Sequence, residues 1–332
     1  MTEANLERGC SKPDESGAEA ITIIVGVGRS GTSLVHSMLG SHSALALPPE
    51  TAFLRRLVVS KDFARSCRNG HGVATLDDDD RLQRVGLTGA ELVAAAGDGA
   101  RPVDVYRSFL RLYRVKMGKP YSGDKDPRAI EWLGAASVAL PGVRIIHVVR
   151  DPRDVLLSKK KADWSSTRGV LWHVFAARVQ LRLGRGSGRR MRLGHYCELI
   201  YEELLDNPSG ELQRLCAFLG LDYEHAMLDF GHEAQRLVSP GEMQWKKETL
   251  GPLLSNNRGK WRGQLRDWEV ALVEQVCGEH FRLGGYESSF AIRRLPLLRR
   301  MWVYALKAII TSVTPLYCTY RSWTNCQAKR RM

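Results

Sequence analysis

A continuous apolar stretch that runs directly into a glycine-rich loop constrains this chain more than any other feature. Residues 21–25 read ITIIV, and β-branched residues in such a run are typical of a strand buried on both faces of a parallel sheet. The loop GVGRSGTS follows at residues 26–33, and apolar residues then recur at helical spacing from Leu34 to Leu39. A loop between a strand and a helix presents backbone amides to an anion, so the sequence predicts a phosphate-binding site here.

The loop fits two phosphate-binding motifs at once. Residues 26–33 have the spacing of G-x-x-x-x-G-K-[ST], but Thr32 stands where that motif has the lysine that reaches the β and γ phosphates of ATP. The glycines of the same stretch also fit G-x-G-x-x-G, and Glu50 lies about twenty residues further on, where a dinucleotide-binding fold has an acidic residue for the ribose. The loop alone leaves both a kinase and an oxidoreductase open.

Further patterns of the same kind indicate an α/β fold. Residues 144–149 (RIIHVV) repeat the strand pattern, and Asp151 and Pro152 follow as the expected N-cap and first position of a helix. The other expected elements are strands at 44–47 and 196–201 and a helix between Pro208 and Gly220. Such alternation predicts a three-layer α/β fold with a central parallel sheet and a P-loop-like phosphate-binding strand-loop-helix.

We expect one globular body between two different ends. The 332 residues, 44% of them apolar, are enough for one large core. Residues 1–19 are polar, without the apolar segment of a signal peptide, and are expected to form a flexible leader. The folded domain is expected at 20–290 with a mostly helical insertion at 55–119, followed by a basic, partly apolar tail at 291–332.

The charge favours an anionic partner. A formal net charge of +13 suits a nucleotide, a nucleic acid, a membrane surface or an acidic acceptor. In the tail, Met301 to Val313 is apolar apart from Lys307, which is too short a run to span a bilayer, so we expect no spanning helix. Residues 295–323 are expected either to dock on the body as a terminal helix or to contact a membrane peripherally.

Four short blocks bear on the choice between functions. They are Arg29-Ser30-Gly31-Thr32, Lys125 in GDKDP, Arg150 in VRDPR with Ser158, and Gly259-Lys260-Trp261. In this order and spacing they resemble the sulfotransferases that use 3′-phosphoadenosine 5′-phosphosulfate (PAPS), and the similarity covers roughly residues 20–287. The resemblance implies transfer of a sulfuryl group to an acceptor hydroxyl, with release of adenosine 3′,5′-bisphosphate (PAP).

The resemblance also implies which residues bind the nucleotide. Arg150 and Ser158 match the family's contacts to the 3′-phosphate, and Lys260 matches a late loop that folds over the cofactor. The expected cofactor-binding residues are Gly28, Arg29, Ser30, Gly31, Thr32, Ser33, Arg150, Ser158, Tyr201, Lys260 and Trp261. Helix N-terminal amides and cationic side chains of this kind suit phosphate groups.

Three residues are expected to carry the chemistry. Glu50 followed by Thr51 matches the catalytic base of the branch that sulfates protein tyrosines, which requires a raised pKa through burial. Lys125 matches the lysine that stabilises the departing phosphate, and Arg29 would neutralise charge on the transferred group. A solvated carboxylate and a solvated lysine are the alternatives. Histidine is the base in other branches of the family, but His36 and His147 are expected to lie in the core rather than act as bases.

The acceptor stays open at this level. The tyrosine-sulfating branch has an arginine two positions after its base, where this chain has Ala52. Carbohydrate, lipid-linked glycan, small metabolite and tyrosine hydroxyls all remain candidates, with the 55–119 insertion as the expected place of the acceptor pocket.

The expected partners are therefore a nucleotide co-substrate and a hydroxyl-bearing acceptor, without nucleic acid. No metal is implied, because a sulfuryl group carries less charge than a phosphoryl group. The expected location is cytoplasmic, with peripheral membrane contact in the second interpretation of the tail. A kinase, an oxidoreductase and a non-catalytic nucleotide or nucleic-acid binder are the competing classes.

Overall fold

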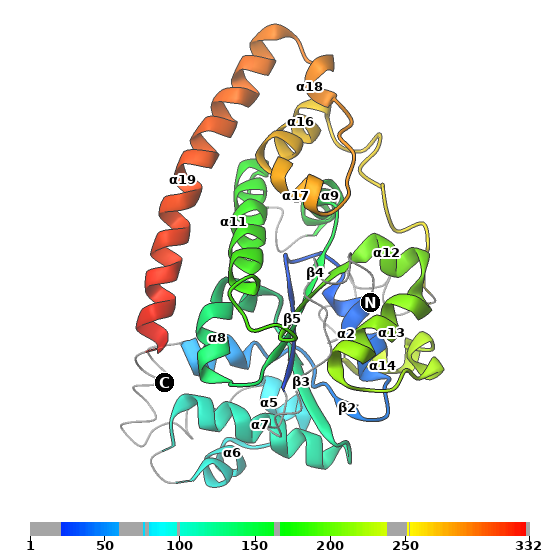
Figure 1. Cartoon of the computed structure of the whole chain (residues 1–332), viewed down its shortest axis with the longest axis vertical. Helices are drawn as coiled ribbons and strands as arrows, with labels where there is room; N and C mark the ends of the chain where they lie inside the picture. Colours follow the sequence, from blue (N-terminus) through cyan, green and yellow to red (C-terminus); the bar gives the residue numbers. More distant parts are fainter. Residues whose placement is uncertain are drawn as a thin grey trace.

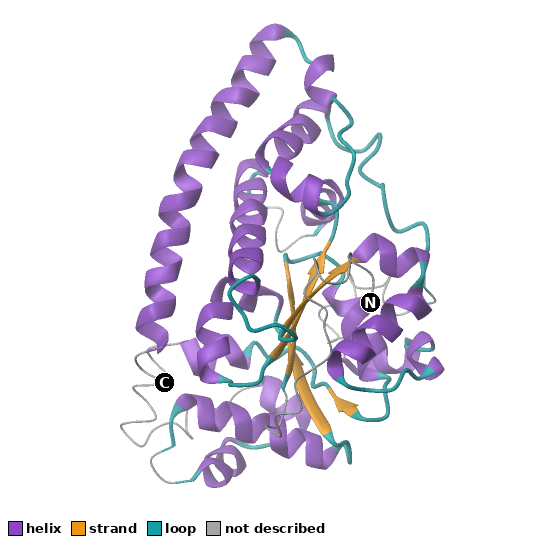
Figure 2. Ribbon diagram, viewed as in Figure 1, coloured by secondary structure: helices purple, strands orange, loops and turns teal. Residues whose placement is uncertain are grey.

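Five parallel strands form the centre of the structure, a computed structural model that describes residues 21–59, 76, 80–97, 100–162, 167–237, 251 and 253–329 (Figure 2). The strands are β1 (Thr22–Gly26), β2 (Leu45–Ala46), β3 (Tyr121–Lys125), β4 (Arg144–Val149) and β5 (Tyr196–Ile200). Their order in the sheet is β2-β3-β1-β4-β5, and every pairing is parallel. The expected leader, residues 1–19, lies outside the described residues.

Helices cover both faces of this sheet, as Figure 1 shows. Ile23 and Val25 of β1 face one core, while Ile24 between them faces the other, which is the alternation of a strand buried on both sides. The first core includes η1 (Leu54–Val59), α5 (Asp80–Val85), α6 (Gly89–Ala96), α7 (Pro102–Lys116), η2 (Pro127–Trp132) and α8 (Leu133–Ala139). The second includes α2 (Thr32–Gly40), α12 (Tyr201–Asp206), α13 (Pro208–Leu219), η3 (His225–Leu228) and α14 (Gly231–Leu237).

A third group of helices shares a core of its own. It consists of α9 (Pro152–Lys161), α11 (Val170–Gly188), α16 (Asp267–Val276), α17 (Gly278–Leu283), α18 (Ala291–Arg294) and α19 (Leu297–Lys329). The sheet order places β1 in the centre, with β2 and β3 on one side and β4 and β5 on the other, so the connections change direction at β1. Open α/β sheets bind ligands at such a switch point, and the loop after β1 lies there.

The three-layer α/β fold expected from the sequence is confirmed. β4 spans the expected residues, and Asp151 caps α9 by accepting a hydrogen bond from the Arg153 amide, with Pro152 at the first position. The described part of the 55–119 segment is largely helical. The pattern did not predict β3, whose sequence YSGDK is polar and contains a glycine.

The tail forms a longer helix than its apolar run suggested. α19 spans 33 residues, and within it Leu297–Gln327 is long and apolar enough to cross a membrane by length and composition alone. We expected no spanning helix because the apolar run from Met301 to Val313 is short. α19 nevertheless reaches this length and mean hydropathy, because its apolar residues continue past the interspersed Thr, Ser and Lys residues. One face of α19 packs on the body, with Val303 and Thr314 fully buried (Figure 1).

Candidate functional site

Two of the three glycines in the loop after β1 are required by close packing, and the third is not. A Cβ on Gly26 would lie 2.5 Å from Ser30 Oγ and 2.7 Å from the Val148 carbonyl oxygen. Gly31, the N-cap of α2, has φ +98°, and a Cβ there would lie 2.2 Å from Cδ2 of Tyr201. At Gly28 no atom lies within 4 Å of such a Cβ. Two glycines therefore allow close packing of the loop, and the third leaves space beside it.

That space belongs to a cleft of about 450 Å³, a usual size for a small-molecule site. Gly28, Gly31, Thr32 and Ser33 line it from the loop. Its charged lining is mostly basic and consists of Arg29, Glu50, Lys125, Arg128, Arg150, Asp154, Lys161 and Lys260. Six cations against two carboxylates give the cleft a positive charge that favours an anionic ligand.

One end of the cleft is built around Arg150, at the carboxyl end of β4. Its guanidinium lies over the Tyr201 ring at 4.4 Å, and Nη2 donates to the Asn257 carbonyl oxygen at 2.8 Å. Arg29 Nε donates to Ser158 Oγ at 2.9 Å, so the loop and α9 meet beside it. Arg150 Nε and Ser30 Oγ are buried and have no hydrogen-bond partner among the described residues. These unsatisfied groups beside an open basic cleft fit an anionic ligand.

The other end is built around Lys125, the last residue of β3. Its side chain is only 2% exposed, and Nζ contacts the Glu50 carboxylate and lies 3.3 Å from Ser33 Oγ. The parallel pairing of β1 with β3 sets Lys125 opposite Ile24, and this register brings the lysine to the loop. The Glu50 side chain is 27% exposed and ion-paired, rather than deeply buried as the sequence suggested for a base.

Buried carboxyl groups flank Lys125 on its own strand. The Tyr106 hydroxyl donates to Asp124 Oδ2 at 2.9 Å, and burial raises the pKa of Asp124 to about 7. Arg55 Nε donates to Asp126 at 2.7 Å, and burial likewise raises the pKa of Asp126 against the opposing effect of that guanidinium. Hydrogen bonds on both sides thus fix the backbone that carries Lys125.

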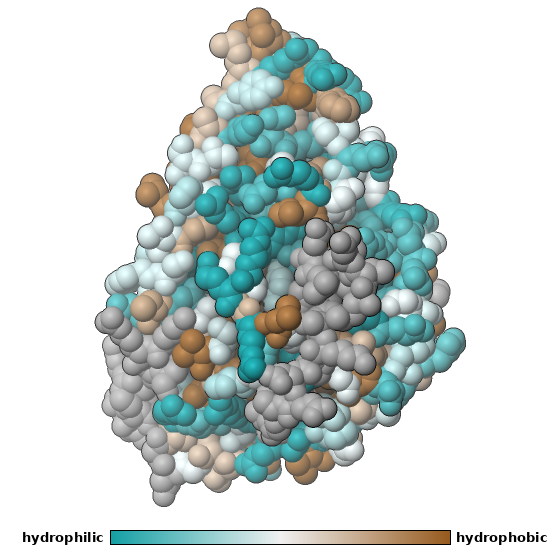
Figure 3. Space-filling model, in the orientation of Figure 1, coloured by the Kyte–Doolittle hydropathy of each residue, from teal (hydrophilic) through white to brown (hydrophobic). Residues whose placement is uncertain are grey.

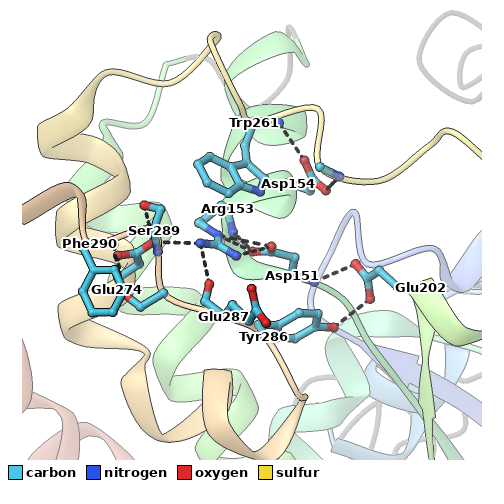
Figure 4. Close-up of polar contacts among 12 residues, drawn as sticks. Asp151, Arg153, Asp154, Glu202, Trp261, Glu274, Tyr286, Glu287, Ser289 and Phe290 are labelled. Carbon is cyan, nitrogen blue, oxygen red and sulfur yellow. Dashed lines mark hydrogen bonds and ion pairs between the residues drawn. The ribbon is translucent and has the colours of Figure 1, made fainter.

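A late loop closes over the side of the cleft formed by α9. The amides of Gly259 and Trp261 donate to the Asp154 carboxylate at 2.6 and 2.9 Å, and these bonds hold the loop on α9 (Figure 4). Lys260, between them, lines the cleft as expected. The Trp261 ring instead is buried and stacks on the Arg153 guanidinium at 4.0 Å.

Most of the expected site residues thus meet in one cleft, and two do not line it. Ser30 and Trp261 are absent from the described lining. Ser30 is buried within the loop, and the Trp261 side chain belongs to the same core cluster as Leu265 and Phe281. Trp261 contributes to this site only through its amide and its packing.

Arg153 connects this site to the C-terminal half of the chain. It forms ion pairs with Asp151 at 2.8 Å and Glu274 at 2.7 Å, and its Nη1 donates to the Glu287 carbonyl oxygen (Figure 4). The adjacent Asp151 amide donates to Glu202, which also accepts from Tyr286. Because Asp151, Arg153 and Glu274 are buried, the network holds the amino end of α9 in place.

The structure adds residues to the site that the sequence reasoning missed. Arg128, Asp154, Lys161 and Asn257 all line the cleft. Arg128 follows the GDKDP block directly and Asp154 follows Arg153, so proximity to a recognised block was the available signal. Asn257, which donates to the Tyr201 hydroxyl at 3.0 Å, lies in a loop without any pattern.

The two histidines considered as bases lie in the interior. His147 is fully buried in β4, its Nδ1 lies 2.6 Å from the Tyr196 hydroxyl, and burial lowers its pKa to about 4. His36 is buried in α2. Among the described residues, no three His, Cys, Asp or Glu side chains are grouped as a metal site requires.

Comparisons with known proteins agree with this geometry. A sequence model described as "Sulfotransferase family" matches residues 22–225, more than half of the chain. Protein-tyrosine sulfotransferase 1 of Danio rerio is 25% identical over 263 residues, which cover 74% of this chain and 66% of that protein. An uncharacterized protein of Aquifex aeolicus is 23% identical over 250 residues, which cover 72% of this chain but only 30% of that protein.

Solved structures share the fold. The sulfotransferase domain of the Synechococcus PCC 7002 olefin synthase superposes with a TM-score of 0.58 at 23% identity, covering 76% of this chain and 90% of that domain. The sulfotransferase domain from the curacin biosynthetic pathway gives 0.56 at 16% identity, covering 82% and 99%. The chain thus shares the three-layer α/β fold of these domains. The sequence model, which covers more than half of the chain, shows that it belongs to the sulfotransferase family and therefore to the transferases.

Proposed function

We propose that this protein transfers the sulfuryl group of PAPS to an acceptor hydroxyl and releases PAP. The observation that carries the proposal is the contact of Lys125 with both Glu50 and the loop residue Ser33. It joins a carboxylate, a cation and the phosphate loop at one end of a basic cleft, where sulfuryl transfer needs a base, a charge stabiliser and a donor site.

PAPS supplies a sulfuryl group bonded to a phosphate leaving group. The loop amides, Arg29 and Lys260 would hold the 5′-phosphosulfate, and Arg150 with Ser158 the 3′-phosphate. Arg150 suits this task because its stacking on Tyr201 and its bond to Asn257 fix the guanidinium before a ligand arrives. The buried Nε that lacks a described partner is a donor suited to a phosphate oxygen.

Glu50 would take the proton of the acceptor hydroxyl as its oxygen bonds to sulfur. The bond between sulfur and the bridging oxygen then breaks, and Lys125 neutralises the charge that remains on the PAP phosphate. The contact with Lys125 holds the Glu50 carboxylate beside the loop. Exposure on one side leaves Glu50 accessible to an acceptor in the cleft.

Incubation of the full chain with sulfur-labelled PAPS and candidate acceptors tests this function. The acceptors would be carbohydrate, glycolipid, small-metabolite and acidic tyrosine-peptide pools, and the readout is labelled product by mass analysis. Glu50→Gln should lower transfer roughly 10²- to 10⁴-fold while sparing PAP binding. Glu279→Gln, at an exposed carboxylate on α17, is the control. Equal transfer by Glu50→Gln and Glu279→Gln would exclude Glu50 as the base.

Three further expectations form part of this proposal. We propose that the protein is cytoplasmic, that transfer does not need a metal, and that residues 55–119 take part in acceptor binding. The described cleft residues all lie outside 55–119. Full transfer in EDTA would agree with independence from metal, and restoration of transfer by Mg²⁺ alone would contradict it.

A further inference from the structure

The outward face of α19 is apolar where a surface helix normally presents charge. Val303, Ile310 and Thr314 recur at helical spacing and pack on the body. The side chains on the opposite side are exposed and include Leu298 (81%), Ile309 (59%) and Leu316 (72%). We call the outer face the set Leu298, Met301, Trp302, Tyr304, Ile309, Val313, Leu316 and Trp323, all of them exposed.

Between Met301 and Trp323, the charged residues of α19 contact the body rather than the outer face. From Met301 to Trp323 the sequence has only two, Lys307 and Arg321. Lys307 Nζ donates to Gln275 of α16 at 3.1 Å, and Arg321 pairs with Glu131 of η2 at 2.8 Å. The outer face therefore runs for about six helical turns without a charged side chain.

The surface where α18 leads into α19 is basic. Arg293 and Arg294 of α18 and Arg299 of α19 are exposed there, and no acidic residue follows Glu287 in the sequence. A shallow hollow at this end is lined by Trp268, Pro296, Leu298, Arg299 and Trp302. The apolar surface at the apex of the molecule lies over this region in Figure 3. Tryptophan beside arginine suits the boundary between lipid headgroups and acyl chains.

We propose that the outer face of α19 lies on the surface of a membrane that contains anionic lipid. The helix lies on the membrane rather than spans it, because spanning would break the contacts of Lys307, Arg321 and Asn325 with the body. A second copy of the chain fits less well, since it would bring the same acid-free, basic segment and no complementary charge. Anionic headgroups supply that charge.

Vesicle flotation of the full chain tests this docking. Vesicles of phosphatidylcholine alone are compared with vesicles that also contain phosphatidylglycerol, at low and high salt. The outer-face variants are Ile309→Glu and Leu316→Glu, and the control is Val115→Glu, at a similarly exposed valine on α7 (67%). Circular dichroism and PAP-induced thermal shift verify that each variant is folded, and light scattering without lipid gives the oligomeric state.

The wild type and Val115→Glu should float with anionic vesicles, and each outer-face variant should lose about tenfold or more of its partitioning. High salt should weaken the binding, because it screens the arginines. Absence of flotation by the wild type, or equal flotation by Ile309→Glu, would overturn the proposal. A lipid-free dimer that Leu316→Glu dissociates would overturn it in favour of a second copy.

Discussion

The two glycines Gly31 and Gly28 should respond in opposite ways to alanine. At Gly31 the positive φ costs an alanine about 1–2 kcal/mol. The Cβ would also approach the Tyr201 ring to 2.2 Å, and relieving such overpacking costs about 1–3 kcal/mol more. Gly31→Ala should therefore lower the free energy of unfolding by about 2–5 kcal/mol in total.

Two matched variants separate these effects. Gly118 has φ +63° and open space around its Cβ position, so Gly118→Ala should cost about 1–2 kcal/mol from the backbone alone. Gly28→Ala has neither problem and should leave stability unchanged or raise it by up to about 1 kcal/mol. Urea denaturation gives the three values. If Gly31→Ala lowers the free energy of unfolding no more than Gly118→Ala does, the close contact between the loop and Tyr201 is refuted.

Three further predictions concern the surroundings of the cleft. Arg153→Ala should lower the free energy of unfolding by about 3–5 kcal/mol in urea denaturation, because it leaves Asp151 and Glu274 buried without their partner. A decrease below about 1 kcal/mol would show that the Arg153 network does not stabilise the fold. Burial raises the pKa of Asp124 from 3.8 to about 7, so the folded state keeps a proton that the unfolded state releases. Its contribution to stability is complete below about pH 4 and is lost as the pH rises to 7, and Asp124→Asn should flatten this part of the pH profile; an unchanged profile would refute it. Trp261→Phe should lower the melting temperature but change PAP affinity less than Lys260→Ala does, and the reverse order would place the indole in the cleft.

The sequence predicted the parts of the fold whose patterns are local. β1, β4 and the beginning of α9 carry their own signals, namely β-branched runs, a capping aspartate and a proline at the first helical position. β3 was missed because neighbours on both sides bury it, while its own residues are polar and end in Asp124 and Lys125. Tertiary pairing, which no local pattern encodes, decides that strand.

For the site, too, local motifs were predicted and tertiary contacts were not. The residues in recognised blocks, such as Arg29, Lys125 and Arg150, line one cleft in the structure. Asn257 was missed because its role depends on an approach to Tyr201 and Arg150 across long stretches of chain. The burial of the Trp261 ring could not be anticipated either, since it depends on α9 and α17 packing around Arg153.

Isothermal titration of the full chain with PAP in EDTA is the most direct test of the donor site. The wild type should bind PAP without Mg²⁺, and Arg150→Ala should weaken the affinity about 10- to 100-fold, as expected when a charged hydrogen-bond donor is lost. Arg282→Ala, at an exposed arginine on α17, should bind like the wild type. Binding of ATP with Mg²⁺ in place of PAP, or equal PAP affinity for Arg150→Ala and Arg282→Ala, would contradict the proposed sulfuryl-transfer function.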